Sequence, residues 1–209
     1  MNKTRIGILL SGGGRTMVNI AQQIAQGDIN GEIVTVISSR SDVAGIERSK
    51  DLGIMPMVIS RKDYDSTSTF SHELFSIMRK ESVSLVLMCG WLCLCEIPED
   101  YTNKVLNIHP SLLPKFGGKG MYGHHVHQAV IANGETESGA TVHFVNNNYD
   151  EGPVIIQRKC AVDQNETADT LAAKVFKEES LAYPQAINYV IEDRILINNN
   201  QVTIKTSTS

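Results

Sequence analysis

Asn107 and His109 stand two positions apart at the end of an apolar segment, Val105–Ile108, and Pro110 follows them. Residues two apart in a β-strand point to the same face, so the two polar side chains should project together. A proline restricts the residue before it to extended backbone, which keeps His109 in the strand geometry. A carboxamide donor beside a titratable imidazole suits a reaction in which a carbonyl oxygen becomes negatively charged. A strand that ends in a polar turn is the alternative interpretation.

A second group of chemically suggestive residues, Ser11–Thr16, follows the first apolar segment, Arg5–Leu10. Glycines allow a tight turn there, and the helix expected to follow offers free N–H groups at its positive end. The spacing matches neither G-x-G-x-x-G nor a Walker A sequence, so a terminal phosphate is a better candidate ligand than a dinucleotide. A tight turn without a ligand is the alternative. The candidate phosphate-binding residues are Gly13, Gly14, Arg15 and Thr16.

Two carboxylates could support such chemistry. Asp150 lies in a polar turn between two predicted strands, and Glu179 lies in the longest predicted helix. A carboxylate within reach of His109 would raise the pKa of the imidazole and fix its orientation. An exposed turn residue and a solvated helix face are the respective alternatives.

Composition and charge narrow the class of protein. The 209 residues are 42% hydrophobic and 20% charged, which is ordinary for a globular chain. The formal net charge is −4 and there is no basic stripe, so nucleic acid is not an expected partner. No apolar segment approaches the ~20 residues of a membrane span, and the first one is too short for a secretory signal. We therefore expect a cytoplasmic protein.

Metal binding is not expected either. The four cysteines, at positions 89, 93, 95 and 160, form no C-x-x-C pair, which argues against zinc-ribbon and thioredoxin-like sites. His124, His125 and His127 crowd together, but they follow a glycine-rich segment, Phe116–Gly123, and no carboxylate or cysteine lies near them in the sequence. We interpret this region as a polar, mobile lid, with zinc as the less favoured alternative.

The elements that must position these residues alternate between strands and helices. This alternation predicts an α/β fold with an open, mostly parallel, twisted sheet of Rossmann-like type, helices on both faces and antiparallel strands towards the C-terminal part. No linker or repeat interrupts it, so residues 1–209 are expected to form one domain. The predicted strands are Arg5–Leu10, Glu32–Ser38, Met55–Ile59, Leu85–Met88, Val105–Ile108, Ser138–Val145 and Pro153–Lys159, with a small hairpin over Arg194–Ile197 and Gln201–Ile204. The predicted helices are Thr16–Gln26, Ala44–Leu52, Thr69–Lys80, Val126–Ala132 and Thr167–Ile191.

Three segments together resemble the folate-dependent formyltransferases. They are Leu106–Pro114, Thr141–Val145, and Asp150-x-Gly152-Pro153-Val154-Ile155, and the resemblance runs from about residue 5 to residue 190. It implies 10-formyltetrahydrofolate as the cosubstrate, no metal, and a cis peptide bond before Pro114. The phosphate-binding first turn, without an appended domain, is most similar to members that formylate the primary amine of glycinamide ribonucleotide in purine biosynthesis. Such an enzyme would bind small molecules only, as a monomer or homodimer.

The resemblance also implies residue roles. Asn107, His109 and Asp150 would be catalytic, and the turn from Gly13 to Thr16 would bind the substrate phosphate. Glu179 would bind the ribose hydroxyls of the substrate. Backbone of two segments would hold the folate, which gives as candidates Leu92, Cys93, Leu94, Cys95, Asn146 and Asn147.

The chain departs from the family pattern at a few positions, which keeps other activities open. Arg15 and Thr16 stand where the family usually has serine or threonine and then asparagine, and Cys93 and Thr67 stand where arginines are common. We expect Arg15 to supply a positive charge near the phosphate. The alternatives are a formyltransferase for another amine, such as a nucleotide sugar or methionyl-tRNA, a formyltetrahydrofolate hydrolase, and a nucleotide-binding module without catalysis.

Overall fold

The computed structural model describes residues 2–206, and the chain divides into two compact units. Unit 1 is Met1–Asn107 and unit 2 is Ile108–Ser209. The boundary falls within strand β5 (Val105–His109), so the backbone of one strand leads from the first unit into the second. A single domain over the whole chain stays a prediction.

Unit 1 is built from a parallel sheet with helical connections. Its strands are ordered β3-β2-β1-β4-β5, and each neighbouring pair is parallel. The strands are β1 (Thr4–Leu10), β2 (Gly31–Ser38), β3 (Met57–Val58), β4 (Leu85–Met88) and the first part of β5. The helices are α1 (Arg15–Gln26), α2 (Ala44–Asp51) and α3 (Thr67–Lys80), with short 3-10 helices at Arg61–Asp63 and Glu99–Tyr101.

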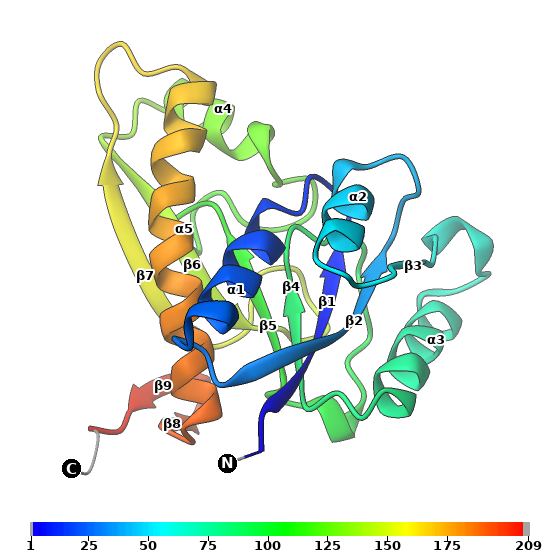
Figure 1. The fold of residues 1–209 in the computed structure, drawn as a ribbon. Helices are drawn as coiled ribbons and strands as arrows, with labels where there is room; N and C mark the ends of the chain where they lie inside the picture. Colours follow the sequence, from blue (N-terminus) through cyan, green and yellow to red (C-terminus); the bar gives the residue numbers. More distant parts are fainter. Residues whose placement is uncertain (1, 207–209) are drawn as a thin grey trace. The chain divides into compact units, whose positions relative to one another are not determined.

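The strand order of unit 1 fixes where its helices lie. The chain moves outward from β1 to β2 and β3, then returns past β1 to β4. Right-handed crossovers therefore place α1 and α2 on one face and α3 on the other. Figure 1 shows α1 and α2 together on the near side of the strands. The order reverses between β1 and β4, and the carboxyl ends of strands at such a point are where open α/β sheets bind ligands.

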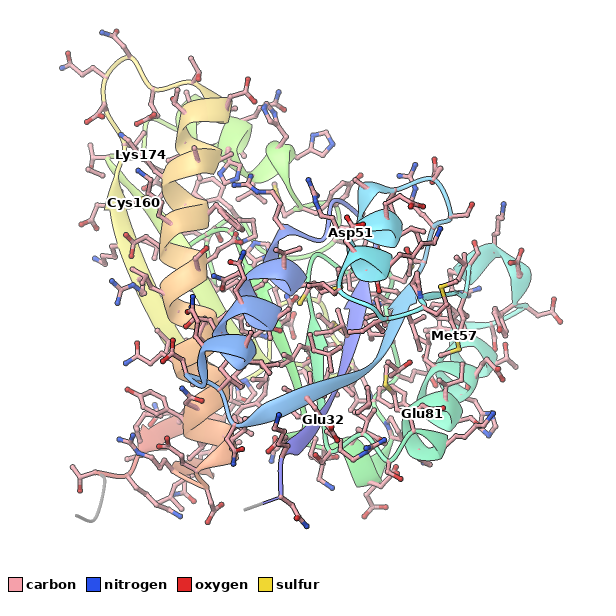
Figure 2. The ribbon with its side chains drawn as sticks, viewed as in Figure 1. Glu32, Asp51, Met57, Glu81, Cys160 and Lys174 are labelled. Atoms are coloured by element: carbon pink, nitrogen blue, oxygen red, sulfur yellow. The ribbon has the colours of Figure 1, made fainter. Side chains whose placement is uncertain are left out.

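A buried core and one ion pair stabilise this sheet. Ile6, Ile8 and Leu87 have no exposed surface, as expected for central strands that are covered on both faces. At the opposite edge, the guanidinium of Arg5 pairs with Glu32 at 3.0 Å and donates to the backbone oxygen of Glu81 at 2.8 Å. Figure 2 labels Glu32 and Glu81 close together at that end of unit 1. Arg5 thus joins β1 to β2 and to the end of α3.

Unit 2 combines an antiparallel strand pair with two helices. Strands β6 (Glu137–Phe144) and β7 (Val154–Ala161) pair antiparallel, and helix α5 (Ala168–Ile191) packs against both. Helix α4 (His124–Ala132) packs against α5. A hairpin of β8 (Ile195–Asn198) and β9 (Gln201–Ile204) follows. The peptide bond between Leu113 and Pro114 is cis, as the family resemblance implied.

The predicted fold class is confirmed, with parallel strands first and antiparallel strands towards the C-terminal part. Most element boundaries differ from those expected by one or two residues, as at β3 and α4. Strand β3 pairs only through Met57–Val58, because it is the edge strand and Met55 is 76% exposed. Helix α4 begins at His124, directly after Gly123, rather than at Val126. No helix within residues 2–206 is long and apolar enough to span a membrane.

Candidate active site

Strand β5 carries both Asn107 and His109, as predicted from their spacing. Asn107 is the last residue of unit 1 and is paired with Met88 of β4 in the parallel sheet. His109 is the last residue of the strand and only 4% of its surface is exposed. The strand therefore extends through His109, one residue beyond the predicted Ile108, as the restriction from Pro110 requires.

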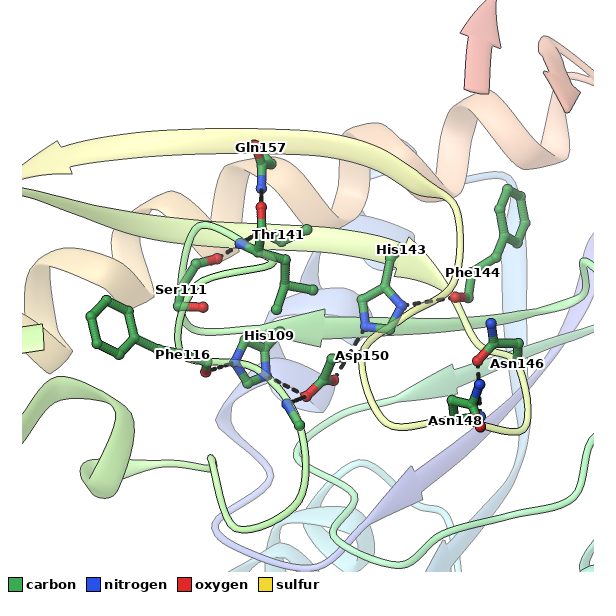
Figure 3. A network of polar contacts seen from close by, with 12 residues as sticks. His109, Ser111, Phe116, Thr141, His143, Phe144, Asn146, Asn148, Asp150 and Gln157 are labelled. Carbon is green, nitrogen blue, oxygen red and sulfur yellow. Dashed lines mark hydrogen bonds and ion pairs between the residues drawn. The ribbon is translucent and has the colours of Figure 1, made fainter. Parts of the chain in front are cut away.

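Both ring nitrogens of His109 face oxygen atoms. Nε2 lies 2.7 Å from the backbone oxygen of Phe116, and Nδ1 lies 3.5 Å from Oδ2 of Asp150 (Figure 3). A carbonyl oxygen can only accept, so Nε2 carries a proton and donates it to Phe116. The predicted proximity of His109 and Asp150 is thus present in the structure. The carbonyl of Phe116 thus accepts from Nε2, the ring nitrogen that does not face Asp150.

The turn that holds Asp150 depends on a glycine. Asp150 has a positive φ of 58°, a conformation that few non-glycine residues adopt and that functional sites often retain. A Cβ on Gly152 would collide with the backbone oxygen of Phe144, so no larger residue fits where the chain turns back into β7. The backbone N–H of Gly118 donates to Oδ2 of Asp150 at 2.9 Å. The D-x-G spacing is therefore needed to place this carboxylate.

His143 is a third member of the cluster, which the sequence did not indicate. Its Nε2 lies 3.5 Å from Oδ1 of Asp150, and its Nδ1 lies 2.8 Å from the backbone oxygen of Phe144 (Figure 3). The bond to Phe144 alone would suit an ordinary hydrogen-bonded strand residue. The contact with Asp150 was not foreseen, because it depends on the path of the following turn.

Burial decides the protonation of His109. Burial lowers the pKa of His109 below its ordinary value, and His143 lowers it further, while the charge of Asp150 and the bond to Phe116 act in the opposite direction. Asp150 acts in the expected direction, but the expectation of a net raised pKa for His109 is wrong, because desolvation outweighs the attraction.

Asp150 stays ionised despite its environment. Burial would raise the pKa of Asp150, but hydrogen bonding from His143, the charge of His109 and the Gly118 N–H together bring that pKa below its usual value. The pair therefore consists of an ionised carboxylate and an imidazole that is more readily neutral than a free histidine.

Thr141 fixes the backbone that follows His109. Its hydroxyl donates to the oxygen of Ser111 at 2.6 Å and accepts from the N–H of Leu113 at 3.1 Å. Gln157 on β7 donates to the hydroxyl of Thr141 at 3.0 Å (Figure 3). It also donates to the oxygen of Leu113 at 2.7 Å. These residues connect β6 and β7 to the cis-proline turn. The polar residues at strand positions 141 and 157 were the only signal in the sequence.

In unit 1, the glycine-rich turn forms the predicted strand-to-helix connection. Gly14 is the N-cap of α1 with a φ of 71°, and a Cβ there would lie 2.9 Å from the Cα of Gly45 on α2. The N–H of Gly45 donates to the oxygen of Gly12 at 3.1 Å, and Arg48 donates to the oxygen of Gly13. Arg15, Thr16 and Met17 form the first turn of α1, which contains no acidic residue.

The segment Leu92–Cys95 follows β4, at the carboxyl end of the sheet of unit 1. The N–H of Leu92 donates to the hydroxyl of Ser11 at 3.0 Å, and Ser39 donates to the same hydroxyl at 2.7 Å. This fully buried serine thus links the ends of β1, β2 and β4. Burial raises the pKa of the Cys95 thiol to about 12 and also raises that of Cys93, so both thiols stay protonated.

The remaining candidates lie in unit 2. Asn146 and Asn147 precede Asp150 in the turn, where Oδ1 of Asn146 accepts from the N–H of Asn148 at 2.9 Å. Glu179 lies on α5 beside Glu178, which pairs with Arg158 at 2.8 Å. The candidates thus divide into two groups, with the glycine-rich turn, Leu92–Cys95 and Asn107 in unit 1 and the rest in unit 2.

The three histidines near α4 have separate partners. Nε2 of His124 pairs with Asp169 at 2.9 Å, and the ring of His125 stacks edge-to-face on Tyr122. His127 is buried, its Nδ1 has no hydrogen-bond partner, and burial lowers its pKa to about 4. Within residues 2–206, no group of three or more His, Cys, Asp or Glu side chains is arranged to hold a metal ion.

Comparison with known proteins agrees with this geometry. The family model described as formyl transferase matches residues 4–187. A phosphoribosylglycinamide formyltransferase of Escherichia coli (strain K12) is 31% identical over 92% of this chain and 90% of its own length. A chloroplastic enzyme of the same name from Arabidopsis thaliana is 36% identical over 92% of this chain and 67% of its own length.

This chain is also similar to a solved structure. The crystal structure of glycinamide ribonucleotide transformylase 1 from Symbiobacterium toebii has a TM-score of 0.91 and 33% sequence identity, and the match covers 98% of this chain and 95% of that one. The family match over residues 4–187 includes the segments that carry His109, His143 and Asp150. This chain belongs to the formyl transferase family.

Proposed function

We propose that this chain is a phosphoribosylglycinamide formyltransferase. It transfers the formyl group of 10-formyltetrahydrofolate to the primary amine of glycinamide ribonucleotide, in de novo purine biosynthesis. The family match over residues 4–187 and the relatives that bear this name support the assignment. The observation that carries it is the buried contact of 3.5 Å between His109 and Asp150, two residues that lie within the matched range 4–187.

Asn107, His109 and Asp150 are the proposed catalytic residues. When the amine attacks the formyl carbon, the carbonyl oxygen gains negative charge. Asn107 and His109 donate hydrogen bonds to that oxygen, and one such preorganised donor contributes about 3–4 kcal/mol to lowering the barrier. Their placement two apart on β5 supports this shared role.

His109 and Asp150 also transfer the proton that the attacking amine releases. Because burial lowers its pKa, His109 is more readily neutral than a free histidine, with its proton on Nε2. The attacking nitrogen releases its proton through a water to the ionised Asp150, which shares it with Nδ1 of His109, so the cation forms beside the carboxylate. The pair then passes this proton, through a water, to N10 of the leaving folate. Nε2 of His109 can reach substrate only when the Phe116 carbonyl gives up its hydrogen bond, so the loop after Pro114 must move.

The glycine-rich turn is the proposed phosphate site. Gly13, Gly14, Arg15 and Thr16 offer backbone N–H groups at the positive end of α1. Arg15 adds a formal positive charge at a position where the family usually has an uncharged serine or threonine. Glu179 on α5 accepts hydrogen bonds from the ribose hydroxyls.

The folate site is proposed to be mainly backbone. Its residues are Leu92, Cys93, Leu94, Cys95, Asn146 and Asn147. Protonated thiols at positions 93 and 95 are poor nucleophiles, which agrees with a binding role rather than a covalent one.

The partners, the oligomeric state and the location of the protein are proposed from the same assignment. The partners are the two small substrates, with no nucleic acid, membrane or metal, and the chain acts as one domain in a monomer or homodimer. Location in the cytoplasm stays part of this proposal.

The test is an acceptor-dependence assay. Purified protein is mixed with 10-formyltetrahydrofolate, with and without glycinamide ribonucleotide, and release of tetrahydrofolate is followed. Turnover that requires the acceptor, with formylated product detected by mass spectrometry, is the expected result. Equal turnover without the acceptor would indicate a hydrolase and contradict the assignment.

A further inference from the structure

His143 lies where β6 is irregular. The register between β6 and β7 shifts between Val142 and His143, so that Val142 pairs with Ile156 and His143 with Val154. Such bulges redirect a side chain and are common beside active sites. His143 is 1% exposed, and its ring is directed towards the turn that carries Asp150 (Figure 3). The proposed mechanism above gives this buried imidazole no role.

The contacts of His143 determine which of its nitrogens can donate. The Phe144 oxygen can only accept, so Nδ1 carries a proton. Nε2 faces Oδ1 of Asp150, and an ionised carboxylate can also only accept. A neutral ring would therefore direct a lone pair at the carboxylate, whereas a protonated ring donates to both oxygens.

His109 repeats this arrangement on the other oxygen of the same carboxylate. Its two nitrogens face the Phe116 oxygen and Oδ2 of Asp150, which also accepts from Gly118. One buried carboxylate can balance one imidazolium, and a second would leave the cluster with a net positive charge. The two rings thus compete for one negative charge. His127 of α4 also interacts electrostatically with His109.

Resting on the proposed function, we propose that His143 is a positioning residue for formyl transfer. Its Nε2–H holds Oδ1 of Asp150, which turns Oδ2 towards His109, and its charge opposes a lasting positive charge on His109. His109 can then give up its proton to the leaving nitrogen after taking it from the attacking one. Without His143, the His109 cation would be stabilised by Asp150 alone and would release its proton less readily.

Two substitutions separate hydrogen bonding from charge. His143→Gln can place an amide N–H where Nε2 stands but carries no charge, whereas His143→Asn can keep only the bond near Nδ1. His72→Gln, at an exposed histidine of α3, is the matched control. The measurements are kcat and KM from pH 5 to 9, and an NMR titration of the His109 ring in each protein.

For His143→Gln we expect a higher pKa of His109 and a basic shift of the kcat profile, with both KM values within about twofold. For His143→Asn we expect kcat to fall about 10²-fold, the lower end of the range for proton-transfer groups, because Asp150 loses a donor and its position. His72→Gln should match the parent protein. An unchanged His109 titration in both His143 variants overturns the proposal. Because that titration needs no turnover, it decides the point even if the formyl acceptor proves to be different.

Discussion

The backbone N–H of Gly118 donates to Oδ2 of Asp150 at 2.9 Å, the same oxygen that faces Nδ1 of His109. The oxygen of Phe116, two residues earlier, accepts from Nε2 of His109. One short segment after the cis-proline turn thus contacts both members of the pair. Movement of this segment would raise the pKa of Asp150 by removing a donor, and would lower that of His109 by removing an acceptor. Loop position and protonation are therefore linked.

Truncation of the proposed oxyanion donors tests the site directly. His109→Ala and Asn107→Ala should each lower kcat by about 10²–10³-fold, because each removes one preorganised donor to the developing charge. Steady-state kinetics with both substrates measures this loss. Thermal unfolding should show that both variants fold, and near-normal turnover in either would contradict its assigned role.

The periodic elements could be predicted from the sequence because local patterns determine them. The central strands β1 and β4 are continuous apolar segments, and α3 places Phe70, Leu74 and Met78 on its buried face. Strand β3 is shorter than predicted. It is the edge strand of the sheet, and the apolar residue Met55 is exposed and does not pair with β2.

The site was predictable only in part. His109 and Asp150 were recognisable as motif residues, but the spacing of residues does not give their distance. His143 was missed because its contact requires the positive φ of Asp150 and the close approach at Gly152, which are properties of the folded turn. The dominance of burial in lowering the pKa of His109 likewise depends on how completely the chain covers the ring.

Gly152→Ala tests the importance of that turn. Its Cβ would overlap the Phe144 oxygen, which is backbone and cannot rotate away, so we expect a loss of about 1–3 kcal/mol in the free energy of unfolding. Activity should fall as well, because Asp150 moves with the turn. Urea unfolding and kcat measure the two effects.

Gly134→Ala is the control for this substitution. Gly134 has a φ of 66° but nothing within 4 Å of the added Cβ, so only the backbone conformation costs energy, about 1 kcal/mol. Parent-like kcat is expected. If Gly152→Ala kept full activity and stability, the close approach would not define the Asp150 turn.

Thr141→Val removes one hydroxyl from a fully buried position. It leaves the N–H of Leu113 without its acceptor and the Ser111 oxygen without its donor, so the free energy of unfolding should fall by about 1–3 kcal/mol. Denaturant titration measures this. Thr203→Val, on the exposed face of β9, should change stability by less than about 0.5 kcal/mol. Equal effects of the two substitutions would show that the Thr141 network contributes nothing.

Arg15→Ala tests the phosphate site. Arg15 is exposed in the first turn of α1, where its charge adds to the helix dipole. We expect a higher KM for glycinamide ribonucleotide, by about tenfold for one lost charged hydrogen bond, with kcat and the KM for the folate little changed. Arg15→Lys should recover part of the affinity. An unchanged KM in Arg15→Ala would refute the role of this side chain.

His127→Leu should change how stability depends on pH. The folded protein holds the pKa of His127 at about 4, well below its ordinary value of 6.5, mainly by burial. The unfolded chain therefore binds a proton at a pH where the folded chain does not. The stability of the parent is complete above about pH 6.5 and falls as the pH is lowered towards 4.

Leucine at position 127 cannot be protonated, and it also removes the unpartnered Nδ1. The free energy of unfolding of His127→Leu, from urea titrations at several pH values between 7 and 4.5, should therefore exceed that of the parent increasingly as the pH falls. Some acid dependence should persist, because the lowered pKa of His109 acts in the same direction. Parallel curves for the two proteins would mean that His127 is as readily protonated in the fold as in the unfolded chain.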